Sequence, residues 1–376
     1  MGYGKRVKNS FVGMLFAFVL FPGSLFLLAW NERDAVRQTG AITEIERVAV
    51  ADVPADAVDS QLDGQLVHMA SEAVTDDVLE YAEFGIREPA VRLRWNASIY
   101  QWTEHRRTED DRTIYTYSKE WVDAPINSSS FHQSGHSNEG STMSFSDGRQ
   151  QASDVRFGAF HLSENLIGQI DAEQPYPLDP SVALDVRPQG FVNGGVFQTG
   201  SEGDPQIGDQ RVEVFVVGPR HDATVMARQS GETFAKYETK VGIPKEILYV
   251  GKLTKSEVIQ RQRTEAAFRR WMFRGLGFVL MWVSLAMLLS PIKALLSFIP
   301  FAGRLLEGAI GIVTFLMALI ISAVVIAIAW FVVRPVLSIS LLVVAVVGFI
   351  YLYRQKSTSD VIPDPSRSGP PPLPNA

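Results

Sequence analysis

The sequence contains no cysteine, and this absence excludes several kinds of chemistry at once. A disulfide framework, a thiol nucleophile and a cysteine-ligated metal are ruled out, whereas an oxidising compartment is not. Histidine is also scarce, with six residues in a chain of 376. His132 and His136 lie four positions apart, but the serine and glycine between them disfavour the helix that would bring both rings to one metal ion. We therefore expect no metal site and no cofactor.

A basic stripe with interleaved aromatic residues is also missing, which disfavours nucleic acid as a partner. The formal net charge is −6, and it is distributed unevenly. Residues 31–270 carry 25 basic and 38 acidic residues, a net of −13, whereas the remainder carries 10 basic and 3 acidic residues, a net of +7. An acidic central part is thus flanked by basic ends.

Charge is absent altogether from four long apolar stretches, at 11–30, 275–292, 308–333 and 335–353. About 20 apolar residues form a helix of about 30 Å, which matches the hydrocarbon thickness of a bilayer. Arg334 and Pro335 separate the last two stretches, and a charge followed by a helix breaker favours a tight turn there. The sequence therefore predicts one N-terminal and three C-terminal transmembrane helices, at 11–30, 271–290, 308–331 and 335–353.

The first stretch has no small-x-small cleavage site, so we interpret it as a retained signal anchor. Basic residues flank the spans on the side of both termini, and the positive-inside rule makes that side cytoplasmic. The predicted cytoplasmic segments are the N-terminus at 1–10, an interfacial loop at 291–307 and a disordered, Pro-rich tail at 354–376. The acidic residues are then translocated, as a β-rich domain at 31–253 and a juxtamembrane helix at 254–270.

Alternation of apolar and polar residues marks the central domain as β-rich. The alternation is strict from Val91 to Ile99 and resumes at 114–122, so these segments are predicted to pair as a long hairpin. Further strands are expected at 41–50, 65–70, 194–198, 210–218, 223–229 and 246–250, short helices at 75–84 and 162–170, and a long exposed loop at 127–151. The predicted fold class is an α+β membrane protein with a large β-rich extracytoplasmic domain inserted between the first and second of four transmembrane helices.

A capping box from Thr254 to Glu257 predicts the start of a helix that continues into the second span. Five arginines follow on this helix, namely Arg261, Arg263, Arg269, Arg270 and Arg274. One interpretation is that they contact lipid phosphates and snorkel to the headgroup level. The other is an ordinary solvated helical stalk. Their position opposite the cytoplasmic side argues against the predicted orientation, but a long translocated domain largely escapes the charge rule.

Several segments, taken in order along the chain, resemble the transmembrane protein 43 family, also called LUMA. They include Asn31-Glu32 after the first span, Gly64 to His68, Pro89 to Arg94, Tyr100 to Trp102, Glu120-Trp121, Ile126 to Ser128, Gly135-His136, Gly208-Asp209, Ala227 to Gln229 and Arg334-Pro335. The resemblance covers residues 11–353 and rests on the order of these motifs. It implies a membrane protein that organises membrane protein complexes and has no known catalytic residues.

Eukaryotic members of that family sit in the endoplasmic reticulum and the inner nuclear membrane, where they contact lamina-associated partners and themselves. The Ala-, Arg- and Asp-rich composition of this chain looks bacterial. For a bacterial protein we expect the inner membrane, with residues 31–270 in the periplasm and both termini in the cytoplasm.

Three classes of function remain open. A membrane scaffold is favoured, with the lipid bilayer, other membrane proteins and a second copy of the chain as partners, because the sequence offers a large recognition domain and no reactive constellation. A channel or transporter component needs polar or ionisable groups inside its spans, and the four uncharged stretches supply none that ionise. An enzyme acting on envelope lipids or polymers needs a histidine paired with a carboxylate, for which His68, His105 and His161 are candidates. We expect no enzymatic activity.

Overall fold

The computed structural model describes residues 3–109, 112–291, 302–333 and 347. The chain divides into two compact units. The β-rich unit consists mainly of Arg37–Phe268, and the helical unit consists of Gly4–Val36 and Arg269–Ala376. Two helices contribute residues to both units, α1 (Tyr3–Val48) and α3 (Lys255–Leu288).

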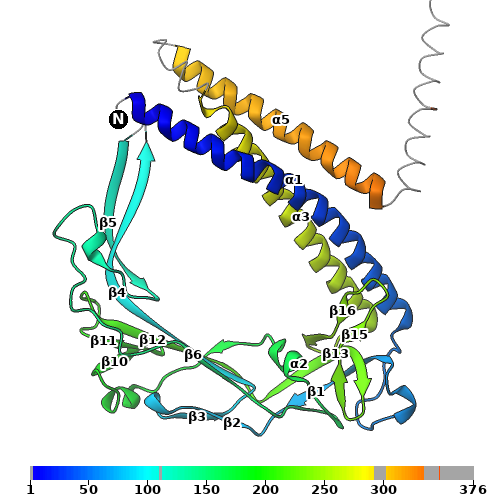
Figure 1. The fold of residues 1–376 in the computed structure, drawn as a ribbon. Coiled ribbons are helices and arrows are strands. Elements are labelled where there is room, and N and C mark those ends of the chain that lie inside the picture. Colours follow the sequence, from blue (N-terminus) through cyan, green and yellow to red (C-terminus); the bar gives the residue numbers. More distant parts are fainter. Residues whose placement is uncertain (1–2, 110–111, 292–301, 334–346, 348–376) are drawn as a thin grey trace, which may run out of the picture. The chain divides into compact units, whose positions relative to one another are not determined.

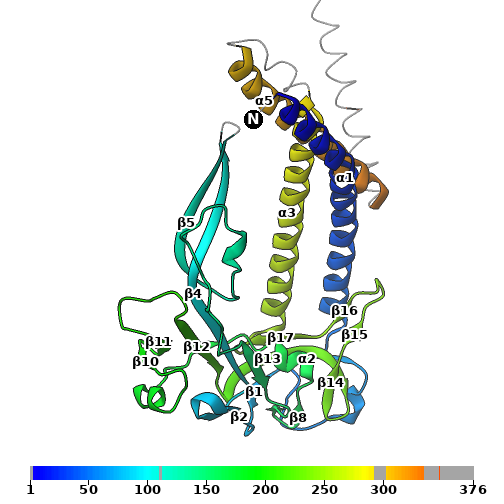
Figure 2. The same cartoon turned by 60° about the vertical axis from the view of Figure 1, so that its left-hand side comes forward.

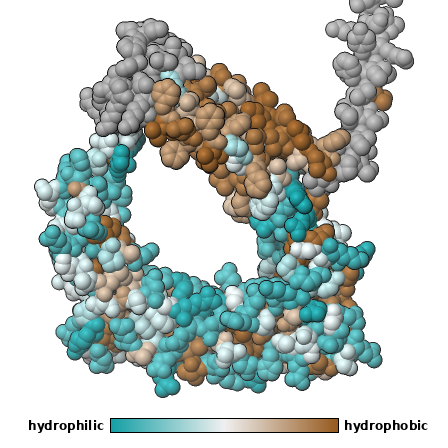
Figure 3. Space-filling view, viewed as in Figure 1, coloured by the Kyte–Doolittle hydropathy of each residue, from teal (hydrophilic) through white to brown (hydrophobic). Residues whose placement is uncertain are grey.

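The helical unit contains the apolar parts of α1 and α3 together with α5 (Ala302–Val333) (Figure 1). Among the described residues, three helical segments are long and apolar enough to cross a membrane, at Phe11–Val48, Lys255–Leu288 and Gly308–Val332. Apolar side chains dominate the visible face of these helices in Figure 3. The fourth predicted span, at 335–353, lies outside the described residues.

Close contact between α1 and α3 depends on one glycine. A Cβ atom added to Gly277 would lie 2.6 Å from Leu28 Cδ2, which is closer than carbon atoms approach. Leu28 is fully buried and packs with Met281, Leu285 and Ala318, the last of which belongs to α5. Small residues let helices approach closely in membranes. The missing side chain at Gly277 of α3 leaves the space that the Leu28 side chain of α1 fills.

The β-rich unit contains two large sheets. The first has six strands in the order β1 (Leu66–Val74), β7 (Arg156–Phe157), β8 (Phe160–His161), β14 (Thr233–Ala235), β13 (Arg220–Ser230) and β17 (Ile247–Val250), and β1 also pairs with β13. The second has seven strands, β10 (Gly190–Asn193), β11 (Val196–Thr199), β12 (Gln210–Val217), β4 (Arg92–Glu109) and β5 (Arg112–Val122) in that order, with β6 (Gly148–Gln151) paired to β4 and β9 (Gln174–Pro175) paired to β12.

Smaller elements complete the β-rich unit. Two short pairs join β2 (Val78–Tyr81) to β3 (Ile86–Pro89) and β15 (Tyr237–Glu238) to β16 (Pro244–Lys245). The short helices are α2 (Glu164–Gly168) and the 3-10 turns η1 (Ser60–Leu62), η2 (Ala82–Phe84), η3 (Ser128–Ser130) and η4 (Pro180–Leu184).

A long hairpin of β4 and β5 is confirmed, but the predicted pairing of 91–99 with 114–122 is wrong, because residues 114–122 pair with residues 99–107 of β4. Residues 92–99 of β4 pair with β12, whereas residues 99–109 pair with β5, so the outer half of the hairpin is two-stranded. Figure 2 shows this outer half as a long twisted ribbon. The strands predicted at 65–70, 210–218, 223–229 and 246–250 and the helix predicted at 162–170 are also confirmed, as β1, β12, β13, β17 and α2. The strand at 194–198 is shorter, because Gly194 and Gly195 form a turn with positive φ before β11.

Two predicted elements are wrong, and a third is wrong in part, because the exposed loop predicted at 127–151 ends in strand β6 and contains the buried side chains of Asn138 and Phe145. Residues 41–48 continue helix α1 instead of forming a strand, so the predicted β-rich domain at 31–253 begins with helix. Ala41, Ile42 and Ile45 are all buried, which is the spacing of one helix face and not of a strand. Residues 75–84 form β2 and η2 instead of an α-helix, because Leu79 and Tyr81 are buried while the residues beside them are exposed.

Each sheet carries its own core, and a third cluster joins the helices to the first sheet. The first core includes Phe157 and Phe160, and the second is built around Phe84, Phe145 and Phe197. In the third cluster, Ile42 and Ile45 of α1 and Val258 and Ile259 of α3 pack with Leu66, Met226 and Ile247 of the sheet. The polar continuations of both membrane helices are therefore part of a buried core.

Candidate functional site at the ends of the membrane helices

Glu32 is a buried carboxylate near the end of the apolar part of α1. Its side chain is 3% exposed, and Arg274 of α3 donates two hydrogen bonds to it, from Nε to Oε1 at 2.6 Å and from Nη2 to Oε2 at 2.8 Å. The indole N–H of Trp330 in α5 donates a third, at 2.7 Å. All three described helices of the helical unit thus meet at one carboxylate, and we call Glu32, Arg274 and Trp330 the Glu32 cluster.

Neighbouring polar contacts reinforce the same junction. The side-chain amide of Asn31 donates to the backbone carbonyl of Arg270 at 3.2 Å, and Arg269 forms an ion pair with Asp34. The Arg274 guanidinium also lies over the ring of Trp271, 4.8 Å from its centre. Bidentate arginine–carboxylate pairs and cation–π contacts both fix orientation. The arrangement sets the register of α1 against α3 at this level.

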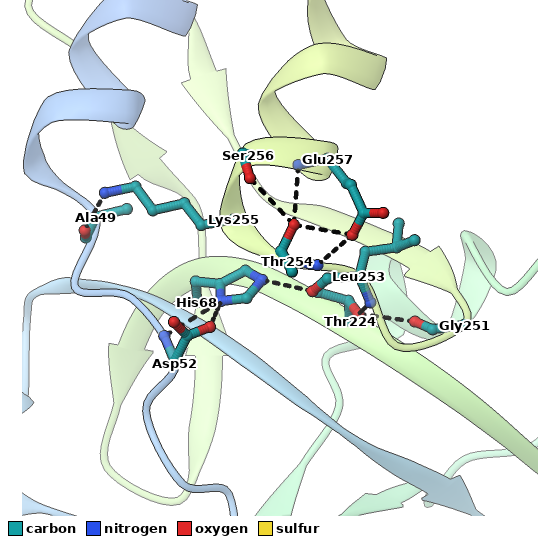
Figure 4. A network of polar contacts seen from close by, with 10 residues as sticks. All are labelled: Ala49, Asp52, His68, Thr224, Gly251, Leu253, Thr254, Lys255, Ser256 and Glu257. Atoms are coloured by element: carbon teal, nitrogen blue, oxygen red, sulfur yellow. Dashed lines mark hydrogen bonds and ion pairs between the residues drawn. The ribbon is translucent and has the colours of Figure 1, made fainter.

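His68 occupies a second junction, within the β-rich unit. It lies on β1 and is 1% exposed, between the segment that follows α1 and the segment that precedes α3 (Figure 4). Its Nε2 is 3.0 Å from the Leu253 carbonyl, and its Nδ1 is 3.3 Å from the backbone N–H of Asp52. A carbonyl only accepts and an N–H only donates, so the neutral ring with its proton on Nε2 satisfies both.

The environment of His68 favours that neutral form. Burial lowers the pKa of His68 below its ordinary value of 6.5, while the Leu253 carbonyl and the negative charge of Asp52 oppose the shift and Lys255 adds to it. The Asp52 carboxylate lies 3.4 Å from Nδ1 and is 80% exposed. The neutral histidine therefore connects two chain segments through hydrogen bonds. The carboxylate of Asp52 lies beside it at the surface.

The start of α3 is fixed beside His68 by the predicted capping box, which is confirmed. The backbone N–H of Thr254 donates to the Glu257 carboxylate at 2.7 Å, and the N–H of Glu257 donates to the Thr254 hydroxyl at 3.3 Å (Figure 4). Lys255 reaches the Ala49 carbonyl just beyond the end of α1, at 2.6 Å. Both helices are thus capped and cross-connected where they join the sheet.

Within the β-rich unit, α1 and α3 are also linked along their length. Arg263 pairs with Glu46 at 2.6 Å on the exposed side. Glu44 of α1 is 7% exposed and accepts hydrogen bonds from the Tyr237 hydroxyl at 3.2 Å and the Lys240 backbone N–H at 2.9 Å. These contacts hold the polar end of α1 against the loop between β14 and β17.

The five arginines for which lipid contact and a solvated stalk were the two interpretations lie in different environments. Arg263, Arg269 and Arg274 pair with acidic residues of α1. Arg261 lies over the ring of Tyr249. Burial raises the pKa of the Tyr249 hydroxyl to about 12. Arg270 donates no hydrogen bond to any residue that the structure describes, and its Nε atom is buried. The sequence did not indicate these acidic partners. Its one available signal was position, because Glu32 and Asp34 directly follow the first apolar stretch and the arginines directly precede the second.

The candidate catalytic histidines have carboxylate or hydroxyl neighbours. His105 Nε2 lies 2.8 Å from Glu120 and 2.9 Å from the Ser118 hydroxyl, both on β5. A serine–histidine–carboxylate triad needs the nucleophile on one ring nitrogen and the carboxylate on the other, whereas here both contact the same atom. His161 Nδ1 pairs with Asp154 at 2.6 Å on the surface. The described residues contain no group of three His, Asp or Glu side chains placed to hold a metal ion.

Residues 126–139 lie across one face of the β4–β5 hairpin, and we call this segment the strap. His136 stacks on the ring of Tyr117 with 3.9 Å between ring centres, and His132 stacks on Tyr115 at 4.1 Å. Asn138 is 5% exposed; its amide accepts from the N–H of Trp102 at 2.8 Å and donates to the carbonyl of Trp102 at 3.0 Å. The strap therefore replaces a neighbouring strand at this point.

Comparison with known proteins agrees with the resemblance noted in the sequence. The family model described as Transmembrane protein 43 matches residues 99–335. Transmembrane protein 43 of Homo sapiens is 28% identical over 356 residues, which cover 89% of this chain and 88% of the human protein. The Transmembrane protein 43 homolog of Drosophila melanogaster is 25% identical over 366 residues, covering 90% of this chain and 94% of the fly protein.

No solved structure gives a significant match. The family model covers more than half of the chain, from β4 through the apolar part of α5. It includes Arg274 and Trp330, whereas Glu32 lies before the matched residues. The chain therefore belongs to the transmembrane protein 43 family.

Proposed function

We propose that this protein is a multi-pass membrane scaffold, which organises membrane protein complexes or envelope structure through its β-rich domain. One observation carries the proposal. The polar ends of α1 and α3 are built into a core with the first sheet, through Ile45, Val258 and Met226 among others. A domain that shares its core with two membrane-entering helices cannot detach, so its role is to display a surface at a membrane.

The proposed orientation places the β-rich domain outside the cytoplasm and both termini inside. The charge split between residues 31–270 and the rest of the chain supports it. In a bacterium the membrane is then the inner membrane and the domain is periplasmic. In a eukaryotic cell it is the endoplasmic reticulum or inner nuclear membrane, with the domain in the lumen.

Single cysteines test the orientation cleanly, because the natural chain has none. Ser129→Cys places a thiol at an exposed position of the domain, and Ser357→Cys places one in the predicted tail. We expect a membrane-impermeant maleimide to label Ser129→Cys in intact cells or right-side-out vesicles, and Ser357→Cys only after permeabilisation. The reverse pattern would overturn the orientation.

The scaffold role is tested by crosslinking in native membranes followed by mass spectrometry. We expect the full-length chain to capture the same membrane proteins in independent preparations, at lysines or introduced cysteines of the β-rich domain. Thr254→Ala/Glu257→Ala, which removes the helix cap but keeps the chain length, should weaken that capture. Recovery of the monomer alone, without a recurrent partner, would refute the scaffold proposal.

A further inference from the structure

The arginines at the Glu32 cluster outnumber the carboxylates. In the stretches 30–36 and 269–274 of the helical unit there are four arginines and two acidic residues. Both acidic residues are already paired, Glu32 with Arg274 and Asp34 with Arg269. Two positive charges therefore remain, on Arg33 and Arg270.

The side chain of neither arginine has a hydrogen-bond or ion-pair partner among the residues that the structure describes. Arg33 is exposed on α1 and takes part in no ion pair or hydrogen bond with them. Arg270 is half-buried, and its Nε lies beneath the surface without an acceptor. An arginine at a buried or interfacial position needs acceptors for its N–H groups. The described residues of the helical unit supply no hydrogen-bond acceptor for these two guanidinium groups, so a ligand bound to the protein would have to supply it.

The level of these two arginines is marked by tryptophan. Trp30, Trp271 and Trp330 all belong to the helical unit and are 42%, 64% and 38% exposed. Trp330 is tied to Glu32, so it lies at the level of the charged cluster. Tryptophan is enriched where a membrane helix meets the headgroup region. The unpaired guanidinium groups thus lie at the depth of lipid phosphates.

We propose that Arg33 and Arg270 each bind the phosphate of an anionic phospholipid in the leaflet marked by the three tryptophans. A guanidinium donates two N–H groups in a fork that matches a phosphate, and each singly charged anionic headgroup offsets one surplus positive charge. Arg263, Arg269 and Arg274 serve the contact between α1 and α3 instead. This inference deepens the proposed function and rests on it only for the insertion of the helical unit in a membrane.

Native mass spectrometry of the full-length chain in mild detergent tests the proposal. The protein is mixed with equal amounts of phosphatidylglycerol and phosphatidylcholine with identical acyl chains, and the retained lipids are counted. We expect the natural chain to retain phosphatidylglycerol preferentially, and Arg33→Gln/Arg270→Gln to lose that preference by about fivefold per arginine. Arg33→Lys/Arg270→Lys, which keeps the charge, should keep part of it.

Arg261→Gln/Arg263→Gln is the matched control, because it also removes two positive charges, both from α3, and should leave the preference intact. An equal loss in this control, or no preference in the natural chain, would overturn the assignment. Inorganic phosphate is added in a separate arm; displacement of the lipid by free phosphate would show that the ligand is not a lipid. Lipid counting on purified protein reads neither orientation nor partners, so its failure is distinguishable from failure of the scaffold proposal.

Discussion

Arg274 and Glu32 are 242 positions apart in the chain and are joined by two parallel hydrogen bonds of 2.6 and 2.8 Å. The Arg274 side chain is 13% exposed and that of Glu32 is 3% exposed. Two buried charges stabilise each other, because removal of either one would leave the other charge buried without a partner. The pair is thus a specific requirement on how α1 meets α3.

Glu32→Gln should lower the free energy of unfolding by about 3–5 kcal/mol, because it leaves the Arg274 guanidinium uncompensated. Glu32→Leu/Arg274→Met removes both charges and should recover most of the loss. The measurement is the thermal unfolding midpoint in detergent. Glu46→Gln is the control: its partner Arg263 is 50% exposed, so a loss below about 1 kcal/mol is expected. Equal losses in the two single variants would contradict the cluster's role.

Gly277→Ala should destabilise the helical unit by about 1–3 kcal/mol through overpacking against Leu28. Gly275→Ala is its matched control, since no atom lies within 4 Å of the Cβ it would add. Alanine favours a helix over glycine by about 1 kcal/mol, so the control should be neutral or stabilising. Leu28→Ala relieves the contact, so Gly277→Ala should lower the unfolding midpoint less in a Leu28→Ala background than in the natural chain. Identical midpoints for the two glycine variants would exclude close packing at Gly277.

Stability of the β-rich unit should fall as the pH drops below about 6.5, which is the ordinary pKa of histidine. Burial lowers the pKa of both His68 and His221 in the folded chain. The unfolded chain therefore binds more protons below pH 6.5, so the contribution is complete above that pH and is lost towards the folded pKa. Unfolding midpoints at about pH 8 and about pH 5 measure the slope.

His68→Gln/His221→Gln should flatten that slope while lowering stability at the higher pH. His161→Gln is the surface control, because the His161 side chain is 51% exposed, and it should keep the slope of the natural chain. A double variant with an unchanged slope would assign the pH dependence to other groups.

Asn138→Ala should release the strap from the hairpin. It removes the two hydrogen bonds to the Trp102 backbone from a side chain that is 5% exposed, with an expected cost of about 1–3 kcal/mol. Hydrogen exchange should quicken across 126–139 and little elsewhere. Asn193→Ala is the control, since Asn193 contacts Glu202 on an exposed turn. Unchanged exchange in the strap would show that the stacked tyrosines hold it without Asn138.

Local pattern predicted most strands because their side chains alternate between core and solvent. Val91, Leu93 and Ala97 are buried as the alternation requires. The strand predicted at 41–50 is wrong, because the spacing of Ala41, Ile42 and Ile45 fits one face of a helix. The helical period of these residues was the informative pattern there.

The candidate site was predictable only in part. The capping box at Thr254 and the arginines of α3 were visible in the sequence, because each depends on residues within one helix. The pairing of Glu32 with Arg274 was not, since it depends on which helix faces which and at what register. His68 was identified as a candidate for catalysis, yet its backbone partners at Asp52 and Leu253 come from distant segments that no local pattern brings together.

The outer half of the β4–β5 hairpin has a consequence for how the domain yields locally. Residues 100–109 of β4 lie beyond the part of the strand that pairs with β12, and the strap borders them through Asn138 and the stacked histidines. Local opening involves segments whose contacts do not reach the main cores. We therefore expect the ribbon and its strap to melt separately, so that the tyrosines of β5 are uncovered while the first sheet and the pairing of β4 with β12 remain intact.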